Sequence, residues 1–159
     1  MAALPSDEIV ELGWDAFEAR LQTAARSPTR AASGDRALRE YFGDDEYQYL
    51  QRLAEQATLM RSRAPALGNV VLLPGIMGSS LTTLDGGGDE DLIWIHLLRL
   101  ATGQIGRLQL TPDGAGEANP ALQVKATDID KRSYARAILW LRAHWNVQPF
   151  AYDWRKDID

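Results

Sequence analysis

Residues 70–81, "VVLLPGIMGSSL", join a short apolar run to a loop that contains one proline and two glycines. The run over 69–73 is bounded by turn-forming residues, which is typical of a fully buried strand in a parallel sheet. In open α/β sheets, ligands bind in loops at the carboxyl ends of such strands. The stretch therefore predicts an α/β fold with a ligand-binding loop directly after this strand.

Composition narrows the class of protein. The chain has 159 residues, a formal net charge of −5, 45% hydrophobic residues and no cysteine. The absence of cysteine excludes disulfides and thiolate metal sites, and the negative charge argues against a nucleic-acid partner. The amino terminus has no signal-peptide pattern, and no apolar run reaches the ~20 residues of a transmembrane helix. We expect a cytoplasmic protein without a cofactor.

The pattern of apolar residues divides the chain into a helical segment, 1–68, and a mixed segment, 69–159. Helices are expected over 7–26 and over 35–63, the second in one or two pieces. In the mixed segment we expect strands over 107–111, 121–129 and 146–150, and a clear amphipathic helix over 130–145. Strand, crossover helix and strand form a βαβ pattern, which again indicates an α/β architecture.

The loop after the first strand has the composition of an anion-binding site. Gly75 and Gly78 let the backbone approach a ligand closely and permit positive φ, while Pro74 sets the direction of exit. The N–H groups of Ile76 and Met77 are then candidates for an oxyanion hole, which stabilises the negative charge that develops during acyl transfer. The alternative interpretation is an ordinary Gly-Pro turn without a ligand.

Four segments in this order resemble one known family. They are "VVLLPGIMGSSL", "LIWIHL", "ALQVKATDID" and "RAHWNVQPFAYDWRKDID". Over residues 69–159 they resemble the lecithin:cholesterol acyltransferase-like α/β-hydrolases, which include acyltransferases and phospholipases. The resemblance implies part of an α/β-hydrolase fold, with a mostly parallel sheet and flanking helices. It also implies a lipid or another acyl ester as substrate.

The resemblance also implies roles for particular residues. The family's oxyanion N–H falls on Ile76, with Met77 beside it at the substrate, and a second oxyanion N–H follows the nucleophilic serine. Trp94 matches a tryptophan of the cap over the acyl-chain site. Residues 152–155, Tyr-Asp-Trp-Arg, match a tetrad of the family. We assign a structural role to its members Asp153, Trp154 and Arg155, because an acid and an arginine at a strand exit can satisfy loop amides and carbonyls.

The sequence departs from the family at the nucleophile. The Gly-x-Ser-x-Gly turn that carries the reactive serine in this fold is absent, and "GSSLT" from Gly78 is the nearest imitation. In the family's order, serine, acid and histidine all follow the tetrad, and the sequence continues only four residues beyond Arg155. We therefore expect the amino-terminal part of a lipid-directed hydrolase or acyltransferase, inactive alone. The rest of the hydrolase domain would be its partner, on the same or another chain.

Other reactive residue types have plainer interpretations. His96 and His144 are expected on surfaces, and Ser79 and Ser80 are expected to cap a turn or helix. The acidic stretch over 85–91 lacks the ligand spacing of a calcium loop, so no metal site is expected there. The missing triad leaves open a second hypothesis, a non-catalytic interaction module with a degenerate hydrolase-like scaffold.

Overall fold

The computed structural model describes residues 5–26 and 32–157. These residues form two compact units. The first unit comprises the described residues up to Leu72 together with Lys131–Gln148, and the second comprises Leu73–Asp130 together with the described residues from Pro149. The domain boundary expected between residues 68 and 69 stays a prediction.

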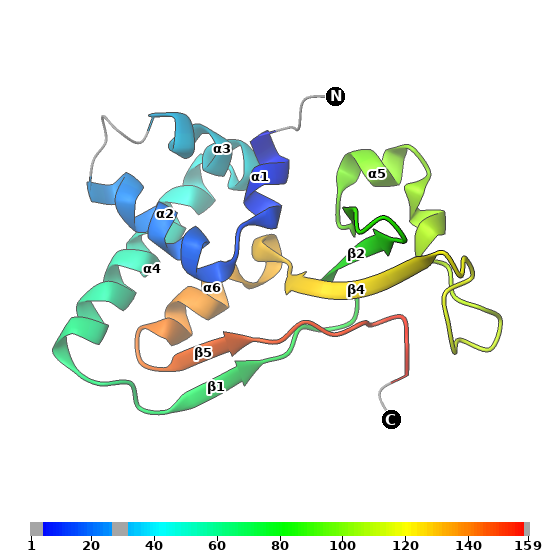
Figure 1. Cartoon of the computed structure of the whole chain (residues 1–159). Helices are drawn as coiled ribbons and strands as arrows, with labels where there is room; N and C mark the ends of the chain where they lie inside the picture. The colour runs from blue at the N-terminus through cyan, green and yellow to red at the C-terminus, as the bar shows by residue number, and fades with distance from the viewer. Residues whose placement is uncertain (1–4, 27–31, 158–159) are drawn as a thin grey trace. The chain divides into compact units, whose positions relative to one another are not determined.

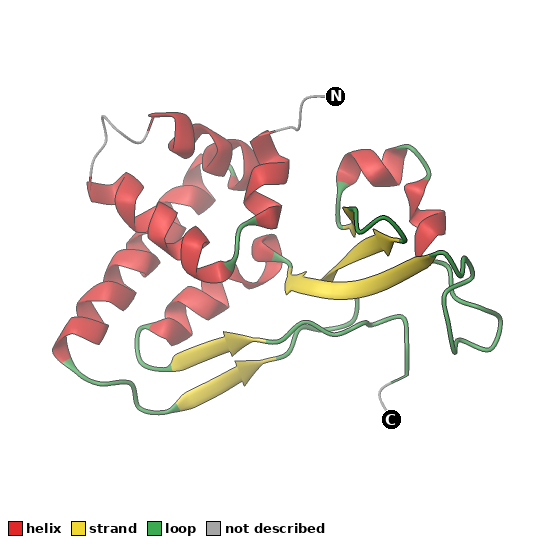
Figure 2. Cartoon of the chain, viewed as in Figure 1, coloured by secondary structure: helices red, strands yellow, loops and turns green. Residues whose placement is uncertain are grey.

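Helices dominate the first unit, and most of the strands lie in the second (Figures 1 and 2). The elements of the first unit are α1 (Pro5–Glu11), α2 (Trp14–Arg26), α3 (Ala32–Phe42), α4 (Asp44–Arg63), β1 (Asn69–Leu72), α6 (Lys131–Arg142) and β5 (Asn146–Pro149, whose last residue belongs to the second unit). The elements of the second unit are β2 (Ser79–Asp85), β3 (Glu90–Trp94), α5 (Leu97–Ala101), the 3-10 helix η1 (Gln104–Leu108) and β4 (Leu122–Ile129).

The expected helices form, and glycines interrupt two of them. The helix expected over 7–26 is two helices, α1 and α2, separated at Gly13, whose carbonyl accepts the first hydrogen bond of α2 from Phe17 N at 2.9 Å. The helix expected over 35–63 is also two, because Gly43 takes a φ of 84° that ordinary residues avoid. The helix expected over 130–145 is confirmed as α6.

One face of each helix of the first unit forms a common apolar core. Helix α4 packs against α2 and α6. The core includes the fully buried side chains of Phe17, Leu21, Leu50, Ile138 and Leu139. The apolar residues that recur at helical spacing in the sequence therefore face the core, as expected of amphipathic helices.

Strands β1 and β5 are parallel neighbours, with α6 leading into β5 (Figure 1). The parallel pairing was expected, but the full burial of β1 was wrong. Its residues alternate in exposure, and Val71 is 58% exposed. Strands of larger parallel sheets are buried because helices cover both faces of the sheet. The described sheet has only two strands, and one face of β1 has no such helix layer.

The second unit is built on an antiparallel sheet in the order β3-β2-β4. Of the five strands described, only β1 and β5 are parallel, so the expectation of a mostly parallel sheet was wrong for these residues. The fold is a small mixture of helices and strands. The core of this unit contains Leu81, Ile93, Leu108 and Val124, one from each strand and one from η1.

The strand expected over 107–111 does not form. Residues Gln104–Leu108 make η1 instead, which follows Gly103 with a φ of 76° and carries Leu108 into the core. Only Leu110 makes an isolated bridge, to Glu117. The apolar residue Leu108 is buried, but the alternation of polar and apolar residues does not produce a strand. The reason is that no partner strand lies beside this segment.

Candidate functional site

The loop that follows β1 is a tight turn with an exposed tip. Gly78 N donates to Gly75 O at 3.0 Å, and Met77, the third residue of this turn, has a φ of 64°. Positive φ at that position is the requirement of a type II turn. Gly75 and Gly78 would permit positive φ at no steric cost, but it is Met77 that adopts it. A bulky residue in this conformation is strained, so the surroundings must hold it there.

Two successive N–H groups at the tip are available to a ligand. Pro74 and Gly78 are buried, whereas Ile76 is 77% exposed. No hydrogen bond within the described part of the chain uses the N–H of Ile76 or of Met77. An exposed N–H without a partner can donate a hydrogen bond to an anionic ligand. The geometry can therefore stabilise a negatively charged oxygen.

Trp94 and the tetrad are attached to this loop by hydrogen bonds. Trp94 Nε1 donates to Met77 O at 2.9 Å, and Trp154 Nε1 donates to Ser79 O at 3.1 Å. The two indole rings contact each other edge to face, with 5.4 Å between their centroids. Tyr152 N also donates to Ser79 Oγ at 3.0 Å. Segments separated by as many as 75 residues in the sequence thus meet at one loop.

Arg155 holds the tetrad in place through a buried ion network. Its guanidinium donates to both carboxylate oxygens of Asp153, at 2.9 and 2.7 Å, and to both of Glu117, at 2.8 and 2.9 Å. It also donates to the carbonyl of Leu108 at 2.7 Å, while Lys156 Nζ lies 3.3 Å from Glu117. The side chains of Arg155 and Glu117 are 6% and 11% exposed, so the network is shielded from water.

The network shifts the pKa values of its members. Burial raises the pKa of Glu117, but hydrogen bonds from Arg155 and the charges of Arg155 and Lys156 outweigh it and lower that pKa below its ordinary value. The same balance of burial against Arg155 lowers the pKa of Asp153. Burial lowers the pKa of Arg155, yet its two carboxylate partners raise it overall. All three groups are therefore charged at neutral pH, as a structural network requires.

The role of Glu117 could not be predicted from the sequence. It lies in a turn-rich segment, 112–120, without any periodicity, and its partner Arg155 is 38 residues away. No local signal could have identified it. The structural role inferred for Asp153 and Arg155 stays a prediction; in the structure Arg155 binds Asp153 and donates to the carbonyl of Leu108.

The other reactive residue types have structural contacts. Ser79 and Ser80 are buried in β2, which corrects the expectation that they cap a turn or helix. His96 Nδ1 accepts a hydrogen bond from Arg99 N at the start of α5, and His144 is exposed after α6. At 85–91, Asp85 Oδ1 accepts from Gly87 N and Asp89 N in the hairpin turn between β2 and β3. Among residues 5–26 and 32–157, no group of three His, Asp or Glu side chains could hold a metal.

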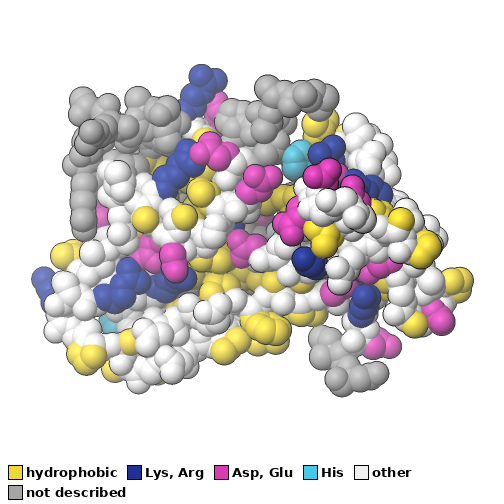
Figure 3. All heavy atoms as spheres, viewed as in Figure 1, with side chains coloured by type: hydrophobic (Ala, Val, Ile, Leu, Met, Phe, Trp, Pro, Cys, Tyr) yellow, Lys and Arg dark blue, Asp and Glu magenta, His cyan; other side chains and the backbone are white. Residues whose placement is uncertain are grey.

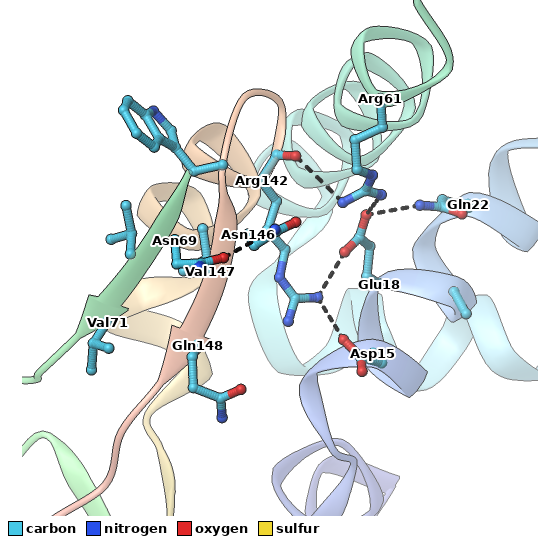
Figure 4. Close-up of a pocket in the computed structure, with 13 residues that line it drawn as sticks. Asp15, Glu18, Gln22, Arg61, Asn69, Val71, Arg142, Asn146, Val147 and Gln148 are labelled. Carbon is cyan, nitrogen blue, oxygen red and sulfur yellow. Dashed lines mark hydrogen bonds and ion pairs between the residues drawn. The ribbon is translucent and has the colours of Figure 1, made fainter. Parts of the chain in front are cut away.

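A polar cleft of about 550 Å³ lies within the first unit, between α2 and the two strands β1 and β5 (Figure 4). Arg142 reaches from the end of α6 to Glu18, with 2.8 Å between Nη1 and Oε2, and to Asp15 at 3.0 Å. Arg61 pairs with the other oxygen of Glu18. Two arginines thus neutralise two carboxylates, so the cleft has no excess charge that would select an ion.

Charged side chains do not form a patch of one sign on the face drawn in Figure 3. Figure 3 shows acidic and basic side chains interspersed on the face in view. Within the described ranges, none of the helices has the length and apolar character needed to cross a membrane.

Comparison of the chain with protein-family models, curated proteins and solved structures finds no match.

Proposed function

We propose that this chain supplies the oxyanion loop of a lipid-directed serine hydrolase or acyltransferase of the lecithin:cholesterol acyltransferase-like family. One observation carries the proposal. The N–H groups of Ile76 and Met77 lie at an exposed tip without partners among the described residues, while Trp94 and Trp154 anchor the backbone behind them. An oxyanion hole needs such donors, held in place before the reaction begins.

The proposed chemistry divides the catalytic work between this chain and residues outside it. A serine outside residues 1–159 attacks the ester carbonyl, and a histidine, oriented by an acid, takes the serine proton. The carbonyl oxygen becomes negatively charged and is held by the N–H of Ile76 and by the N–H that follows the serine. The histidine then passes the proton to the departing alcohol, and water or an acceptor alcohol releases the acyl group.

The proposal also covers the substrate, the partner, the fold and the location of the protein. The substrate is a lipid or another acyl ester, with Met77 and Trp94 near it. The partner is the remainder of the hydrolase domain, on the same or another chain. The finer fold assignment, part of an α/β-hydrolase, and a cytoplasmic location belong to the same proposal.

A pair of substitutions at Ile76 tests the proposal in the natural protein that carries this chain. Wild type is expected to hydrolyse p-nitrophenyl esters and to react with a fluorophosphonate probe at a serine outside residues 1–159. Ile76→Ala keeps the N–H and should retain turnover. Ile76→Pro removes it and should reduce kcat on the order of a hundredfold or more, since one oxyanion donor is worth ~3 kcal/mol.

The result is interpreted only if both variants keep the melting temperature and KM of the wild type. Full turnover by a folded Ile76→Pro variant would reduce the loop to an ordinary turn. The absence of both hydrolysis and labelling in the wild type would overturn the proposal.

A non-catalytic interaction module is the second candidate. It is favoured by the structural surroundings of Ser79, Ser80 and His96, which do not form a nucleophile and base. Ser79 and Ser80 are buried in β2, and His96 caps α5. The fluorophosphonate experiment separates the two candidates, because a module without a nucleophile leaves the probe unreacted.

A further inference from the structure

The loop tip raises the question of what keeps Met77 in its strained conformation. A non-glycine residue with a φ of 64° pays a steric cost that glycine does not. Left to itself, the turn would relax toward a conformation with negative φ at Met77. Because φ of Met77 orients the peptide unit between Met77 and Gly78 relative to the one before it, that change would shift the loop tip that carries the N–H of Ile76.

The peptide unit between Met77 and Gly78 is held at both ends. Its N–H, on Gly78, donates to Gly75 O at 3.0 Å, and its carbonyl, on Met77, accepts from Trp94 Nε1 at 2.9 Å. The first bond belongs to the turn itself. The second comes from β3, so Trp94 is the group outside the loop that fixes the far side of Met77.

Trp94 is itself well placed to resist movement of the loop. Its ring packs edge to face on Trp154, 5.4 Å away, and both rings adjoin the core of the second unit. Trp154 in turn donates to Ser79 O at 3.1 Å. Two indole N–H groups thus bind the carbonyls on either side of Gly78. An indole has one donor and no acceptor, so each bond depends on that single N–H.

We infer that Trp94 is a positioning residue, whose indole N–H holds Met77 at positive φ and so fixes the loop tip that presents the N–H of Ile76 to an oxyanion. The catalytic consequence rests on the proposed function, whereas the holding of the loop does not. This role differs from the acyl-chain contact that the family resemblance implies for Trp94. A positioning residue affects every ester alike, whereas an acyl-chain contact favours long chains.

Amide hydrogen exchange on ¹⁵N-labelled chain tests the holding of the loop. Trp94→Phe keeps an aromatic ring and removes the N–H. The exchange of Gly78 N–H is expected to accelerate about fivefold, the equivalent of one ordinary hydrogen bond. Val124, in the core of the same unit, should keep its exchange rate. Trp140→Phe is the matched control, because Trp140 is 61% exposed on α6.

A second substitution asks whether the strain at Met77 is what Trp94 opposes. Met77→Gly removes the steric cost of positive φ, so Trp94→Phe should accelerate Gly78 exchange less in that background. A merely structural contribution of Trp94 would give the same acceleration in both backgrounds. Unchanged exchange of Gly78 in Trp94→Phe, or equal effects with Met77 and with glycine, would overturn the inference.

Turnover of short and long esters by the natural protein then separates the inference from the proposed function. With p-nitrophenyl acetate and p-nitrophenyl palmitate, Trp94→Phe should lower kcat by the same factor and leave KM unchanged. A larger loss on palmitate would overturn positioning as the catalytic role and make Trp94 an acyl-chain contact. A wild type without turnover would overturn the proposed function, while the exchange result would still decide whether Trp94 holds the loop.

Discussion

Replacing Glu117 with glutamine should destabilise the second unit, because it removes the carboxylate to which Arg155 donates two hydrogen bonds. Hydrogen bonds to charged groups contribute about 1.5–3 kcal/mol each. Glutamine keeps one acceptor but turns an NH₂ group toward the other guanidinium N–H. Asp153 still neutralises Arg155, so the charge is not left alone. We expect a loss of about 2–3 kcal/mol, below the about 3–5 kcal/mol of an unpaired buried ion.

Native-state hydrogen exchange is the appropriate assay, because the chain has two compact units and a single melting curve would mix them. The slowest amides of β2 and β4 should exchange roughly 30- to 150-fold faster in Glu117→Gln at about pH 7. Glu90→Gln is the matched control in the same unit. Glu90 lies 3.8 Å from Lys125, with both side chains about half exposed, and such pairs contribute little.

The pH dependence gives a second check with a definite sign. Because the pKa of Glu117 is lowered in the folded chain, its contribution is present above the ordinary value of 4.5 and is lost as the pH falls through the folded value. Wild type and Glu117→Gln should therefore converge in stability as the pH is lowered from about 5 toward about 3. Equal effects at Glu117 and Glu90, or a difference that grows on acidification, would refute the reasoning about the network.

Two further predictions concern the first unit. Arg142→Met should speed exchange in α4 by roughly 30-fold, since it removes one of the two arginines that pair with Glu18, whose side chain is 6% exposed, and a hydrogen bond to a charged group contributes about 2 kcal/mol. Arg36→Met, at a side chain that is 76% exposed, should leave these amides unchanged, and equal effects would contradict the argument. Gly43→Ala should lower stability by about 1 kcal/mol, because Gly43 has a φ of 84° with open space where the Cβ would lie. A denaturant midpoint equal to that of the wild type would show that the bend between α3 and α4 tolerates a side chain.

The sequence by itself determined which segments are helical and allowed for two pieces over 35–63, although it did not predict the break at Gly13. The apolar spacing of α4 and α6 and the glycine at Gly43 act within a few residues, so they can be read without knowing the fold. The same holds for β4 and for the turn after β1, where proline and glycine mark the end of the strand. The oxyanion role of Ile76 came from local composition and from family resemblance, and it remains a prediction.

Tertiary structure alone decided the details that make the loop a candidate site. Met77 rather than a glycine takes the positive φ, and Trp94, 17 residues away, binds its carbonyl. Glu117 pairs with Arg155, which is 38 residues away in the sequence. Segment 107–111 does not form the expected strand, because no partner strand lies beside it. Hydrogen bonds and ion pairs depend on which segments meet after folding. Local periodicity records only which side chains are buried, so it cannot specify those partners.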